Sequence, residues 1–283
     1  MDVSNKVCLI TGASGGIGLV TALEIARQGL QVVIVSSNEQ RCAAAVAKIR
    51  AQTGNQAVNF LVADLSSQAQ VRDLAQRFHQ KYQRLDILIN NAGGIFMKRK
   101  ETVDGIELTW ALNHLSYFLL THLLLDTLKA STPARIINVS SNAHTGGGIN
   151  FDDLEGKRFY FGWLAYAQSK LANVLFTFEL ARRFQNSGVT ANVLHPGFVA
   201  TNFGYNNRGI VGAIIRLSYR FGISPEEGAR TSVYLATSSE VEGVSGEYFV
   251  KCKATQAAKR AYDEAVAKRL WEVSVEMTGL AKS

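Results

Sequence analysis

Short β-branched runs alternate with longer helical patterns along most of the chain. Six runs have the apolar character of strands buried on both faces, and they span Val7 to Thr11, Val32 to Ser36, Val58 to Ala63, Leu85 to Asn90, Arg135 to Ser140 and Val189 to Leu194. The segments between them are long enough for the crossover helices that parallel strands require, and these helices are expected at Gly16 to Gln28, Glu39 to Gln52, Ser67 to Tyr82, Gly105 to Lys129 and Leu164 to Asn186. The alternation predicts an α/β fold with a doubly wound parallel sheet and helices on both faces.

The same rhythm continues towards the C-terminus. A seventh strand is expected at Gly246 to Val250, after a helix at Pro225 to Thr237 whose opening supplies a cap, a first-turn proline and two acids. No linker or break in composition divides the chain. Residues 1–283 are therefore predicted to form one domain built on a seven-stranded parallel sheet.

Two segments depart from this rhythm. Residues 202–223 carry glycines, asparagines and scattered aromatics directly after the sixth strand, which favours a substrate lid over an inert surface insertion. Residues 255–275 are expected to contain the last helix, because Gln256 to Trp271 place apolar side chains on one stripe, namely Ala258, Tyr262, Val266 and Leu270. We favour a helix docked on the protein over one lying on a membrane surface.

Composition and charge narrow the class of protein. The chain has 283 residues with 47% apolar content, which suits a compact domain and excludes disorder. Its three cysteines form no ligand motif, so we expect neither a disulfide framework nor a metal site, and a reducing, cytoplasmic setting is the simplest. The net charge of +7 is spread without a basic run, which argues against nucleic acid as a partner. The N-terminus shows no apolar leader, and Leu115 to Leu125 is too short to span a bilayer, so no transmembrane anchor is expected.

A glycine-rich turn follows the first predicted strand and opens the first predicted helix. Its G-x-x-x-G-x-G spacing lets bare backbone approach a pyrophosphate while amide groups point at it. The residues expected to bind the cofactor here are Gly12, Ser14, Gly15, Gly16, Ile17 and Gly18. With the doubly wound pattern, this turn predicts a Rossmann fold that binds a dinucleotide.

The end of the second strand bears on which dinucleotide is bound. An acidic residue there would hold the 2'-hydroxyl of an NAD ribose, but the chain continues with Ser36, Ser37 and Asn38. These groups, with Arg41 a few residues on, could donate hydrogen bonds to a 2'-phosphate. We therefore expect NADP(H) rather than NAD(H), although Arg41 could also be an ordinary solvated residue of a helix's first turn.

Further cofactor contacts are expected at the ends of the third and fourth strands. Asp64 could accept a hydrogen bond from an adenine amino group, with Leu65 beside it, or it could simply be a cap. Asn90 is expected to brace backbone inside the sheet. The small residues that follow it would let a ribose approach, and these are Asn91, Ala92 and Gly93.

Proton chemistry is indicated by a tyrosine and a lysine on one helical face. Tyr166 and Lys170 are four residues apart, so their side chains lie together. A fixed ammonium in a dry site lowers the tyrosine pKa from about 10, which allows proton transfer near neutral pH. The preceding strand ends in Ser140 and Ser141, where a hydroxyl could polarise a carbonyl oxygen. Tyrosine and lysine at this spacing also occur by chance, so the interpretation of the pair as catalytic depends on the serine that precedes it.

In combination, these motifs resemble the short-chain dehydrogenase/reductase superfamily from Lys6 to about Val250. The resemblance implies that Tyr166 is the general acid or base, that Ser141 orients the substrate oxygen, and that Lys170 lowers the tyrosine pKa and holds the nicotinamide ribose. It implies that Asn113 completes a proton relay, although a helix-interior asparagine satisfied by backbone is the alternative. It also places four residues around the nicotinamide, namely Pro196, Gly197, Val199 and Thr201.

A narrower resemblance is to the retinol dehydrogenase-like branch, through Ala165 to Phe176, Glu179 to Arg183 and His195 to Gly197. That branch carries a comparable insertion before Tyr166, whose aromatic residues could line an apolar pocket but are more often packing, and these are Phe159, Tyr160, Phe161 and Trp163. Unlike these relatives, the chain shows no N-terminal anchor and has Ser37 where they commonly carry arginine. The helices after the fourth and fifth strands resemble those through which family members pair, which implies a homodimer or homotetramer.

The sequence thus predicts an NADP(H)-dependent oxidoreductase acting on a small, fairly apolar alcohol or carbonyl compound, with retinoid-like compounds as one candidate. A regulatory protein that senses NADP(H) without turnover is the alternative, and the complete set of serine, tyrosine, lysine and asparagine argues against it. An isomerase or dehydratase that uses bound nucleotide is a third possibility, for which the chain leaves little room for a larger substrate domain.

Overall fold

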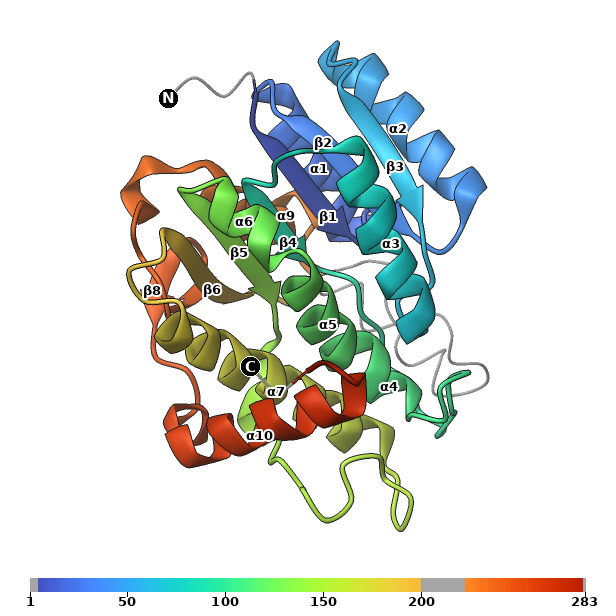
Figure 1. The fold of residues 1–283 in the computed structure, drawn as a ribbon, viewed down its shortest axis with the longest axis vertical. Helices are drawn as coiled ribbons and strands as arrows, with labels where there is room; N and C mark the ends of the chain where they lie inside the picture. Colours follow the sequence, from blue (N-terminus) through green and yellow to red (C-terminus); the bar gives the residue numbers. More distant parts are fainter. Residues whose placement is uncertain (1–4, 200–221, 282–283) are drawn as a thin grey trace.

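The computed structural model describes residues 5–199 and 222–281, and the strands in these ranges form one eight-stranded sheet (Figure 1). The strands are β1 (Val7–Thr11), β2 (Gln31–Ser36), β3 (Val58–Val62), β4 (Ile87–Asn90), β5 (Ala134–Val139), β6 (Val189–His195), β7 (Tyr248–Val250) and β8 (Lys253–Thr255). Their order is β3-β2-β1-β4-β5-β6-β7-β8, parallel up to β7, with β8 antiparallel. The chain switches sides between β1 and β4, and doubly wound sheets bind ligands at the carboxyl ends of such strands.

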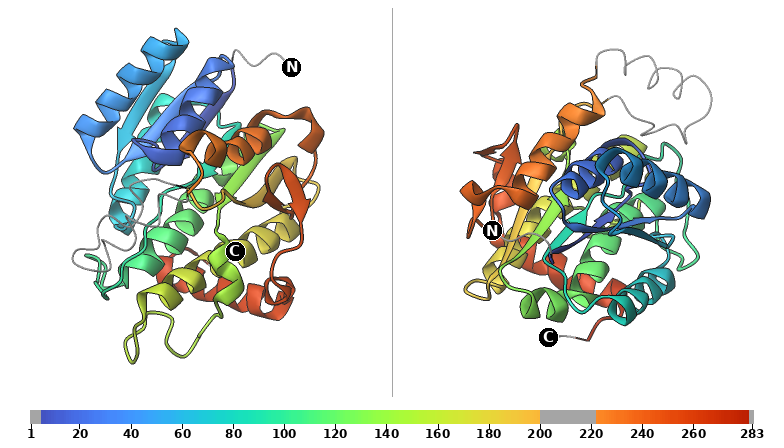
Figure 2. Two further views of the ribbon diagram at one scale, coloured as in Figure 1. Left: turned by 180° about the vertical axis from the view of Figure 1, so that it is seen from behind. Right: turned by 90° about the horizontal axis from the view of Figure 1, so that it is seen from above.

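Helices cover both faces of this sheet. They are α1 (Gly16–Arg27), α2 (Glu39–Thr53), α3 (Gln68–Lys81), α4 (Leu108–Trp110), α5 (Ser116–Leu123), α6 (Leu125–Ala130), α7 (Gly162–Arg183), α9 (Pro225–Thr237) and α10 (Glu264–Thr278), with a π-helical turn η1 (Ala111–Leu115) and 3₁₀ turns η2 (Asn142–Gly146), η4 (Ser239–Val241) and η5 (Lys259–Tyr262). Helices α3, α5 and α7 lie on the face shown in Figure 1, with α10 packed on α7, whereas α1, α2 and α9 lie on the other face (Figure 2).

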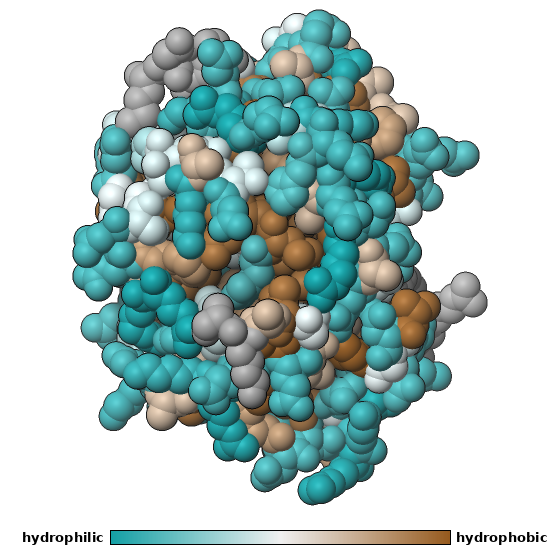
Figure 3. Space-filling model, in the orientation of Figure 1, coloured by the Kyte–Doolittle hydropathy of each residue, from teal (hydrophilic) through white to brown (hydrophobic). Residues whose placement is uncertain are grey.

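Successive residues of each strand point to opposite faces of the sheet and pack in two separate hydrophobic cores. Leu9 and Val33 belong to the cluster under α3 and α5, whereas Ile10 and Ile34 belong to the cluster under α1 and α2, and all four are fully buried. Burying each such side chain contributes about 1.5–3 kcal/mol to stability. Polar residues cover most of the outer surface in Figure 3, and apolar ones gather in the middle of that face.

The α/β class and the strand pattern agree with the sequence prediction. Each of the six N-terminal predicted strands begins and ends within two residues of an observed one. The helix at Pro225–Thr237 has the predicted bounds because Ser224 caps it, its hydroxyl accepting from the backbone N–H of Glu227 at 3.2 Å.

The prediction of seven strands was wrong by one. Strand β8 pairs with β7 through a turn at Lys251 and Cys252, which both adopt positive φ, at 50° and 62°. Neither residue is a glycine or asparagine, so the usual sequence signal of a two-residue hairpin is missing. The strand itself is three residues long and fully exposed, and it therefore lacks an apolar pattern.

The helix predicted at Gly105 to Lys129 is broken into four pieces. A short α4 leads into the π-helical turn η1, then α5, and the backbone bends at Leu124 before α6 begins. Apolar periodicity does not register the one-residue expansion of a π-helical turn, because the side chains on either side remain buried.

The last helix begins later than predicted. Residues 259–262 form the 3₁₀ turn η5, and α10 starts after Asp263, whose carboxylate accepts from the backbone N–H of Val266 at 3.0 Å. Tyr262 is half exposed and stacks on Phe178, so it does not share a helical stripe with Leu270. The docked position is confirmed, because Leu270 and Trp271 are buried against the body of the protein.

The predicted lid at 202–223 lies outside the described residues except for its last two, and Thr201 also lies outside them. Ile223 forms a parallel bridge with Val199. None of the helices described in 5–199 and 222–281 is both long enough and apolar enough to cross a bilayer. Cys8, Cys42 and Cys252 are all free thiols.

Candidate active site

The turn between β1 and α1 is shaped by glycines. Gly12 has a φ of 68°, and a Cβ atom there would lie 2.7 Å from the Cα atom of Ala92. At Gly18 an added Cβ would lie 2.6 Å from the carbonyl oxygen of Gly12. Among the described residues, no side chain caps the N-terminus of α1, so its first amide groups are open to an anion. The turn has the shape and the donors that a pyrophosphate needs.

Hydrogen bonds fasten the end of β4 to this turn. The Thr11 hydroxyl oxygen accepts from the backbone N–H groups of Asn91 and Ala92 at 2.9 and 3.0 Å. The side-chain amide of Asn91 donates to the carbonyl oxygen of Thr11 at 2.8 Å and to that of Gly12 at 3.3 Å. Asn91 therefore supports the turn, a role that its small size alone did not predict. Asn90 is fully buried and donates to side chains of β5 and α5.

Hydroxyls and a guanidinium surround the end of β2. The Ser14 hydroxyl donates to the Ser36 hydroxyl at 2.9 Å. An Arg41 guanidinium nitrogen lies 3.5 Å from the position that a Cβ atom of Gly15 would take, which places Arg41 beside the phosphate turn. Asn38 caps α2 instead of facing the cavity, and its side-chain oxygen accepts from the backbone N–H of Arg41 at 2.9 Å.

The predicted residues after β3 combine a local role with a place at the site. An Asp64 carboxylate oxygen accepts from the backbone N–H of Ser66 at 2.9 Å and from its hydroxyl at 2.7 Å. Leu65 is 6% exposed. Both Asp64 and Leu65 line the cavity described below.

Tyr166 and Lys170 project from α7 towards the ends of β4 and β5. The Lys170 ammonium donates to the carbonyl oxygen of Val139 at 3.0 Å and lies 5.7 Å from the centroid of the Tyr166 ring. Lys170 is 3% exposed, and burial lowers its pKa to about 7. Of the residues that the structure describes, none gives it a carboxylate partner. An ammonium this close favours the phenolate form of a neighbouring tyrosine.

The two serines after β5 differ in their surroundings. Ser140 is 2% exposed, and its hydroxyl donates to the carbonyl oxygen of Lys170 at 2.8 Å. Ser141 is partly exposed and lines the cavity, and its hydroxyl oxygen accepts from the backbone N–H of Ala143 at 3.2 Å. Among the residues that the structure describes, none accepts its hydroxyl proton. This arrangement supports Ser141 over Ser140 as the residue that could hold a substrate oxygen.

Two histidines that the sequence analysis did not assign a role support the Ser141 loop. His144 donates from Nδ1 to the carbonyl oxygen of Ser141 at 2.8 Å, and its Nε2 accepts from the backbone N–H of Ala258 at 3.0 Å. His195 Nδ1 accepts from the backbone N–H of Asn142 at 3.1 Å. Burial lowers the pKa of His195 to about 4, with a further contribution from His144. Both imidazoles are therefore held neutral as parts of the scaffold.

Asn113 lies behind the cavity and does not line it. It is fully buried in η1. Its side-chain oxygen accepts from the backbone N–H of Gly94 at 2.8 Å, and its amide donates to the carbonyl oxygen of Gly94 and to the Ser169 hydroxyl, both at 2.9 Å. Its side chain thus joins the loop after β4 to α7.

The segment after β6 closes one side of the site. Gly197 has a φ of 95°, and a Cβ atom there would lie 2.5 Å from a terminal carbon of Ile223. The backbone N–H of Ile223 donates to the carbonyl oxygen of Phe198 at 2.8 Å. Glycine at 197 thus allows the chain to fold back beside the carboxyl ends of the strands.

These elements enclose a cavity of about 730 Å³ at the carboxyl edge of the sheet. Nearly all predicted site residues line it, namely Gly12, Ser14, Gly15, Gly16, Ile17, Gly18, Ser36, Ser37, Arg41, Asp64, Leu65, Asn91, Ala92, Gly93, Ser141, Tyr166, Lys170, Pro196, Gly197 and Val199. Asn38 and Asn113 do not line it. Residues from seven separate segments therefore meet at one site.

Several apolar side chains that sequence reasoning missed also line the cavity, and these are Ile95, Met97, Leu112 and Phe198. Their only sequence signal is their nearness to Gly93, Asn113 and Gly197. Of the aromatic residues in the insertion, Trp163 lines the cavity, but Phe159 and Phe161 line a separate hollow of about 330 Å³. The Tyr160 hydroxyl donates to the carbonyl oxygen of Phe96 at 2.7 Å, which is a packing role.

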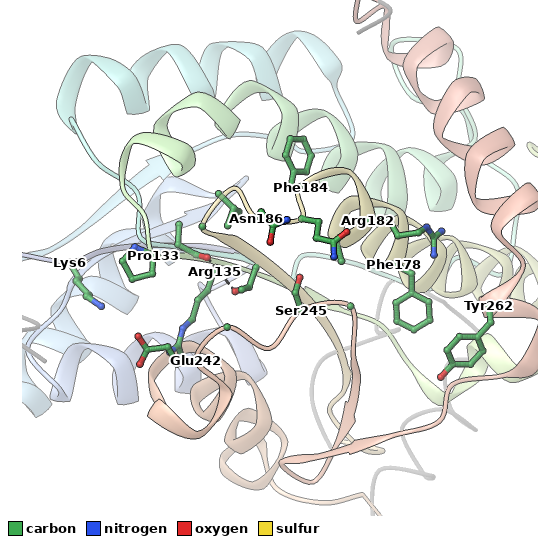
Figure 4. Close-up of a pocket in the computed structure, with 18 residues that line it drawn as sticks. Lys6, Pro133, Arg135, Phe178, Arg182, Phe184, Asn186, Glu242, Ser245 and Tyr262 are labelled. Atoms are coloured by element: carbon green, nitrogen blue, oxygen red, sulfur yellow. Dashed lines mark hydrogen bonds between the residues drawn. The ribbon is translucent and has the colours of Figure 1, made fainter.

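A second large cavity, of about 780 Å³, lies at the opposite, amino-terminal edge of β5 and β6 (Figure 4). It shares no lining residue with the first. Its cations are already engaged, because Arg182 pairs with Glu179 at 2.9 Å and Arg135 donates to the carbonyl oxygens of Leu235 and Ser238. Within the described ranges, no group of three or more His, Cys, Asp or Glu side chains could hold a metal ion.

The site at the carboxyl edge can therefore bind an anion at its glycine turn and move a proton at its tyrosine. Ile95 and Met97 pack in one cluster with Tyr166, whose ring centroid lies 6.0 Å from that of Trp163. The polar turn and Arg41 lie at the ends of β1 and β2. A charged ligand bound at the glycine turn, with an apolar compound bound next to it, fits this separation of polar and apolar lining residues.

Comparisons with known proteins agree with this geometry. The family model for short chain dehydrogenases matches residues 6–209. Retinol dehydrogenase 13 of Homo sapiens is 46% identical over 98% of this chain and 86% of its own. A crystal structure of an uncharacterized protein from Mycobacterium Paratuberculosis is 32% identical, with a TM-score of 0.78 over 98% of this chain and 96% of its own. A Pseudomonas aeruginosa RhlG/NADP active-site complex is 27% identical, with a TM-score of 0.68 over 86% of this chain and 93% of its own.

Proposed function

The chain belongs to the short-chain dehydrogenase family, in its retinol dehydrogenase-like branch, and is an oxidoreductase. From that premise we propose that it interconverts an alcohol and a carbonyl group on a fairly apolar substrate with NADP(H) as cofactor. The observation that carries this proposal is the buried Lys170 ammonium 5.7 Å from the Tyr166 ring, in the cavity that the glycine turn opens into. A non-catalytic nucleotide-binding protein has no need of that charge.

Tyr166 is the proposed general acid or base. In reduction it donates its phenolic proton to the substrate oxygen, and in oxidation the phenolate takes the hydroxyl proton. The Lys170 ammonium lowers the cost of the phenolate, and its remaining N–H groups would hold the nicotinamide ribose. When bound, the nicotinamide supplies or accepts the hydride at the substrate carbon.

Ser141 is the proposed anchor for the substrate oxygen. No residue in 5–199 or 222–281 accepts its hydroxyl proton, and donating that proton to the substrate oxygen would stabilise negative charge there in the transition state. The Ser140 hydroxyl donates to the carbonyl oxygen of Lys170 and so supports the lysine backbone instead.

Preference for NADP(H) is proposed from the end of β2. A cofactor 2'-phosphate would meet the Ser36 and Ser37 hydroxyls and the Arg41 guanidinium, with no carboxylate among the cavity-lining residues of that turn. Charge-assisted hydrogen bonds from a guanidinium suit a phosphate. The NADP complex of the RhlG relative supports the same preference.

An apolar substrate is proposed from the lining beside Tyr166. Ile95, Met97, Leu112, Trp163 and Phe198 offer carbon surfaces and few hydrogen-bonding groups. The name of the human relative makes retinoid-like aldehydes and alcohols the first compounds to test.

The test is a titration with NADPH and NADH, followed by a turnover assay. Cofactor fluorescence should show NADPH binding at least about tenfold tighter than NADH. Loss of reduced-cofactor absorbance should then occur with some members of a panel of apolar aldehydes and ketones that includes retinal. Tighter NADH binding would contradict the cofactor preference.

Two other outcomes of these assays would contradict larger parts of the proposal. Binding without turnover across a broad panel would replace the enzyme proposal with a sensor of NADP(H). Failure to bind either nucleotide would contradict the assignment of the glycine turn itself.

A further inference from the structure

The turn that carries Asn113 needs support from outside its own helix. Residues 111–115 form a π-helical turn, which holds one more residue than an α-helical turn and is a rare feature concentrated at functional sites. Asn113 lies in the middle of it and is fully buried. Its side chain bonds to Gly94 and Ser169, so a third group that contacts Asn113 does so through its backbone.

A second asparagine holds that backbone. The side-chain amide of Asn173, on α7, donates to the carbonyl oxygen of Asn113 at 2.8 Å. The side-chain oxygen of Asn173 lies 3.3 Å from Nδ1 of His114, the next residue of the same π-helical turn. Asn173 therefore contacts the turn at two adjacent residues, and both it and His114 are fully buried.

His114 extends this contact to the C-terminal helix. Its Nε2 lies 2.9 Å from the hydroxyl oxygen of Ser274, in α10, which is also fully buried. The same hydroxyl lies 2.8 Å from the carbonyl oxygen of Leu270 in its own helix. The result is a buried path from α10 through η1 to α7, joining three segments far apart in the sequence.

The proton positions along this path are consistent with one another. Because the Asn173 amide group donates to Asn113, its oxygen is an acceptor, and His114 Nδ1 carries the hydrogen. Burial lowers the pKa of His114 to about 4, so the imidazole is neutral near pH 7. Its Nε2 faces the Ser274 hydroxyl, whose single proton is donated either to Nε2 or to the carbonyl oxygen of Leu270. From His114 onwards the donors point towards Asn113, an arrangement in which neighbouring hydrogen bonds strengthen one another.

Beyond Asn113 the path reaches the proposed proton donor. The Ser169 hydroxyl, which accepts from Asn113, donates to the carbonyl oxygen of Tyr166 at 2.7 Å. Asn113 also binds both backbone polar groups of Gly94, next to the cavity-lining Gly93. An added Cβ at Gly93 would lie 3.5 Å from the Lys170 ammonium. A shift of η1 would thus move the groups around both Tyr166 and Lys170.

We propose that Asn173, His114 and Ser274 are positioning residues that hold the π-helical turn of Asn113, which makes the C-terminal helix α10 part of the catalytic scaffold. The inference rests on the proposed function for its catalytic consequence, but its structural part stands by itself. None of the three residues lines the cavity, so they act through Asn113.

The test compares two hydroxyls of α10. Ser274→Ala removes the bond to His114, whereas Thr278→Val removes a buried hydroxyl one turn later that bonds only to carbonyl oxygens of α10, those of Ser274 and Val275. We expect Ser274→Ala to lower kcat about five- to tenfold with the NADPH Kd within about twofold of wild type. Thr278→Val should lower Tm to a similar degree and leave kcat within about twofold.

Hydrogen exchange gives a measurement that does not depend on turnover. The backbone amide of Gly94 bonds to Asn113. We therefore expect the exchange rate of a peptide containing Gly94 to rise at least about fivefold in Ser274→Ala and to stay at the wild-type value in Thr278→Val. Asn173→Leu, which keeps the side-chain volume but removes both bonds, should have the larger effect on both measurements. Equal kcat and equal exchange in Ser274→Ala and Thr278→Val would overturn the inference. Absence of turnover in the wild type would instead contradict the proposed function, and the exchange comparison would still decide this one.

Discussion

The two large cavities of this protein have nearly the same volume and differ in almost everything else. One lies at the carboxyl edge of the sheet and the other at the amino edge, at about 730 and 780 Å³. The first has an uncapped helix N-terminus at its glycine turn, where an added Cβ at Gly12 would meet backbone atoms of Ala92. In a parallel sheet, the strand ends and helix N-termini meet at the carboxyl edge, so that edge collects open N–H groups. Volume alone therefore does not identify the site.

The cations of the two cavities also differ in burial and in their partners. Lys170, at the first, is buried with a carbonyl oxygen as its hydrogen-bond partner, and burial lowers its pKa to about 7. Arg182, at the second, is exposed and paired with Glu179. A buried charge without a counter-ion costs stability and is retained where a reaction uses it. The predictions below separate the two cavities, from the largest expected effect to the smallest.

The same substitution should act very differently at the two cavities. Tyr166→Phe removes the proposed acid, and we expect kcat to fall about 10²- to 10⁴-fold with NADPH binding within about twofold of wild type. Tyr262→Phe removes a hydroxyl at the second cavity, which accepts from the backbone N–H of Ala257, and should leave kcat unchanged. Steady-state kinetics with a substrate from the aldehyde panel measures both. Undiminished turnover by Tyr166→Phe would rule out the mechanism.

The buried charge of Lys170 should make stability depend on pH. Its folded pKa of about 7 lies below the unfolded value of about 10.4. Below pH 7 both states are protonated and the folded state bears the full burial cost. Between these pKa values the unfolded state binds more protons, so the free energy of unfolding rises with pH by at most about 1.4 kcal/mol per unit. Lys170→Met removes the charge, so its stability advantage over wild type should shrink as pH rises.

Urea unfolding of both proteins at pH 6, 7, 8 and 9, without cofactor, measures that difference. A stability difference that stays constant over this range would show that Lys170 does not titrate there in the folded protein.

Arg41 should control the choice of cofactor. Arg41→Ala removes the guanidinium beside the phosphate turn, and we expect the Kd for NADPH to rise about tenfold while that for NADH stays the same. Lys48→Ala is the matched control, because it removes one exposed cation from the same helix away from the cavity. Fluorescence titration measures all four constants. Equal weakening for both nucleotides would assign Arg41 to the shared pyrophosphate instead.

The smallest effect is expected at the second cavity. Gln185 lines it and is exposed. Gln185→Ala should change stability by less than about 0.5 kcal/mol and leave kcat and NADPH binding unchanged. A marked loss of turnover would show that the amino edge is coupled to the reaction.

Much of the candidate site was predictable because it depends on local patterns. The glycines of the first turn, Ser141, Tyr166 and Lys170 follow strands or share a helical face, and parallel strands bring such positions to one edge. The Tyr166 role and the cofactor preference stay predictions, as does the assignment of residues 1–283 to one domain. Asn38 shows the limit of this reasoning, because an N-cap position and a cofactor contact have the same sequence signal.

What the sequence missed depends on contacts between distant segments. His144 supports Ser141 through Ala258, 114 residues away, and Ser274 reaches His114 across 160 residues. No pattern within one element encodes such a partner. The Asn173 amide that bonds to the backbone of the π-helical turn likewise lies on another helix.

By itself, the sequence determined the alternation of strands and helices, the edge at which the site lies and the residues that we propose move a proton there. Periodicity and turn chemistry are properties of neighbouring residues, and they act before distant segments meet. The tertiary structure decided which of two serines donates its hydroxyl proton to a backbone carbonyl oxygen, how far Lys170 is buried, and which buried groups bond to Asn113. These depend on packing and on loss of water around each group, and packing exists only once the chain has folded.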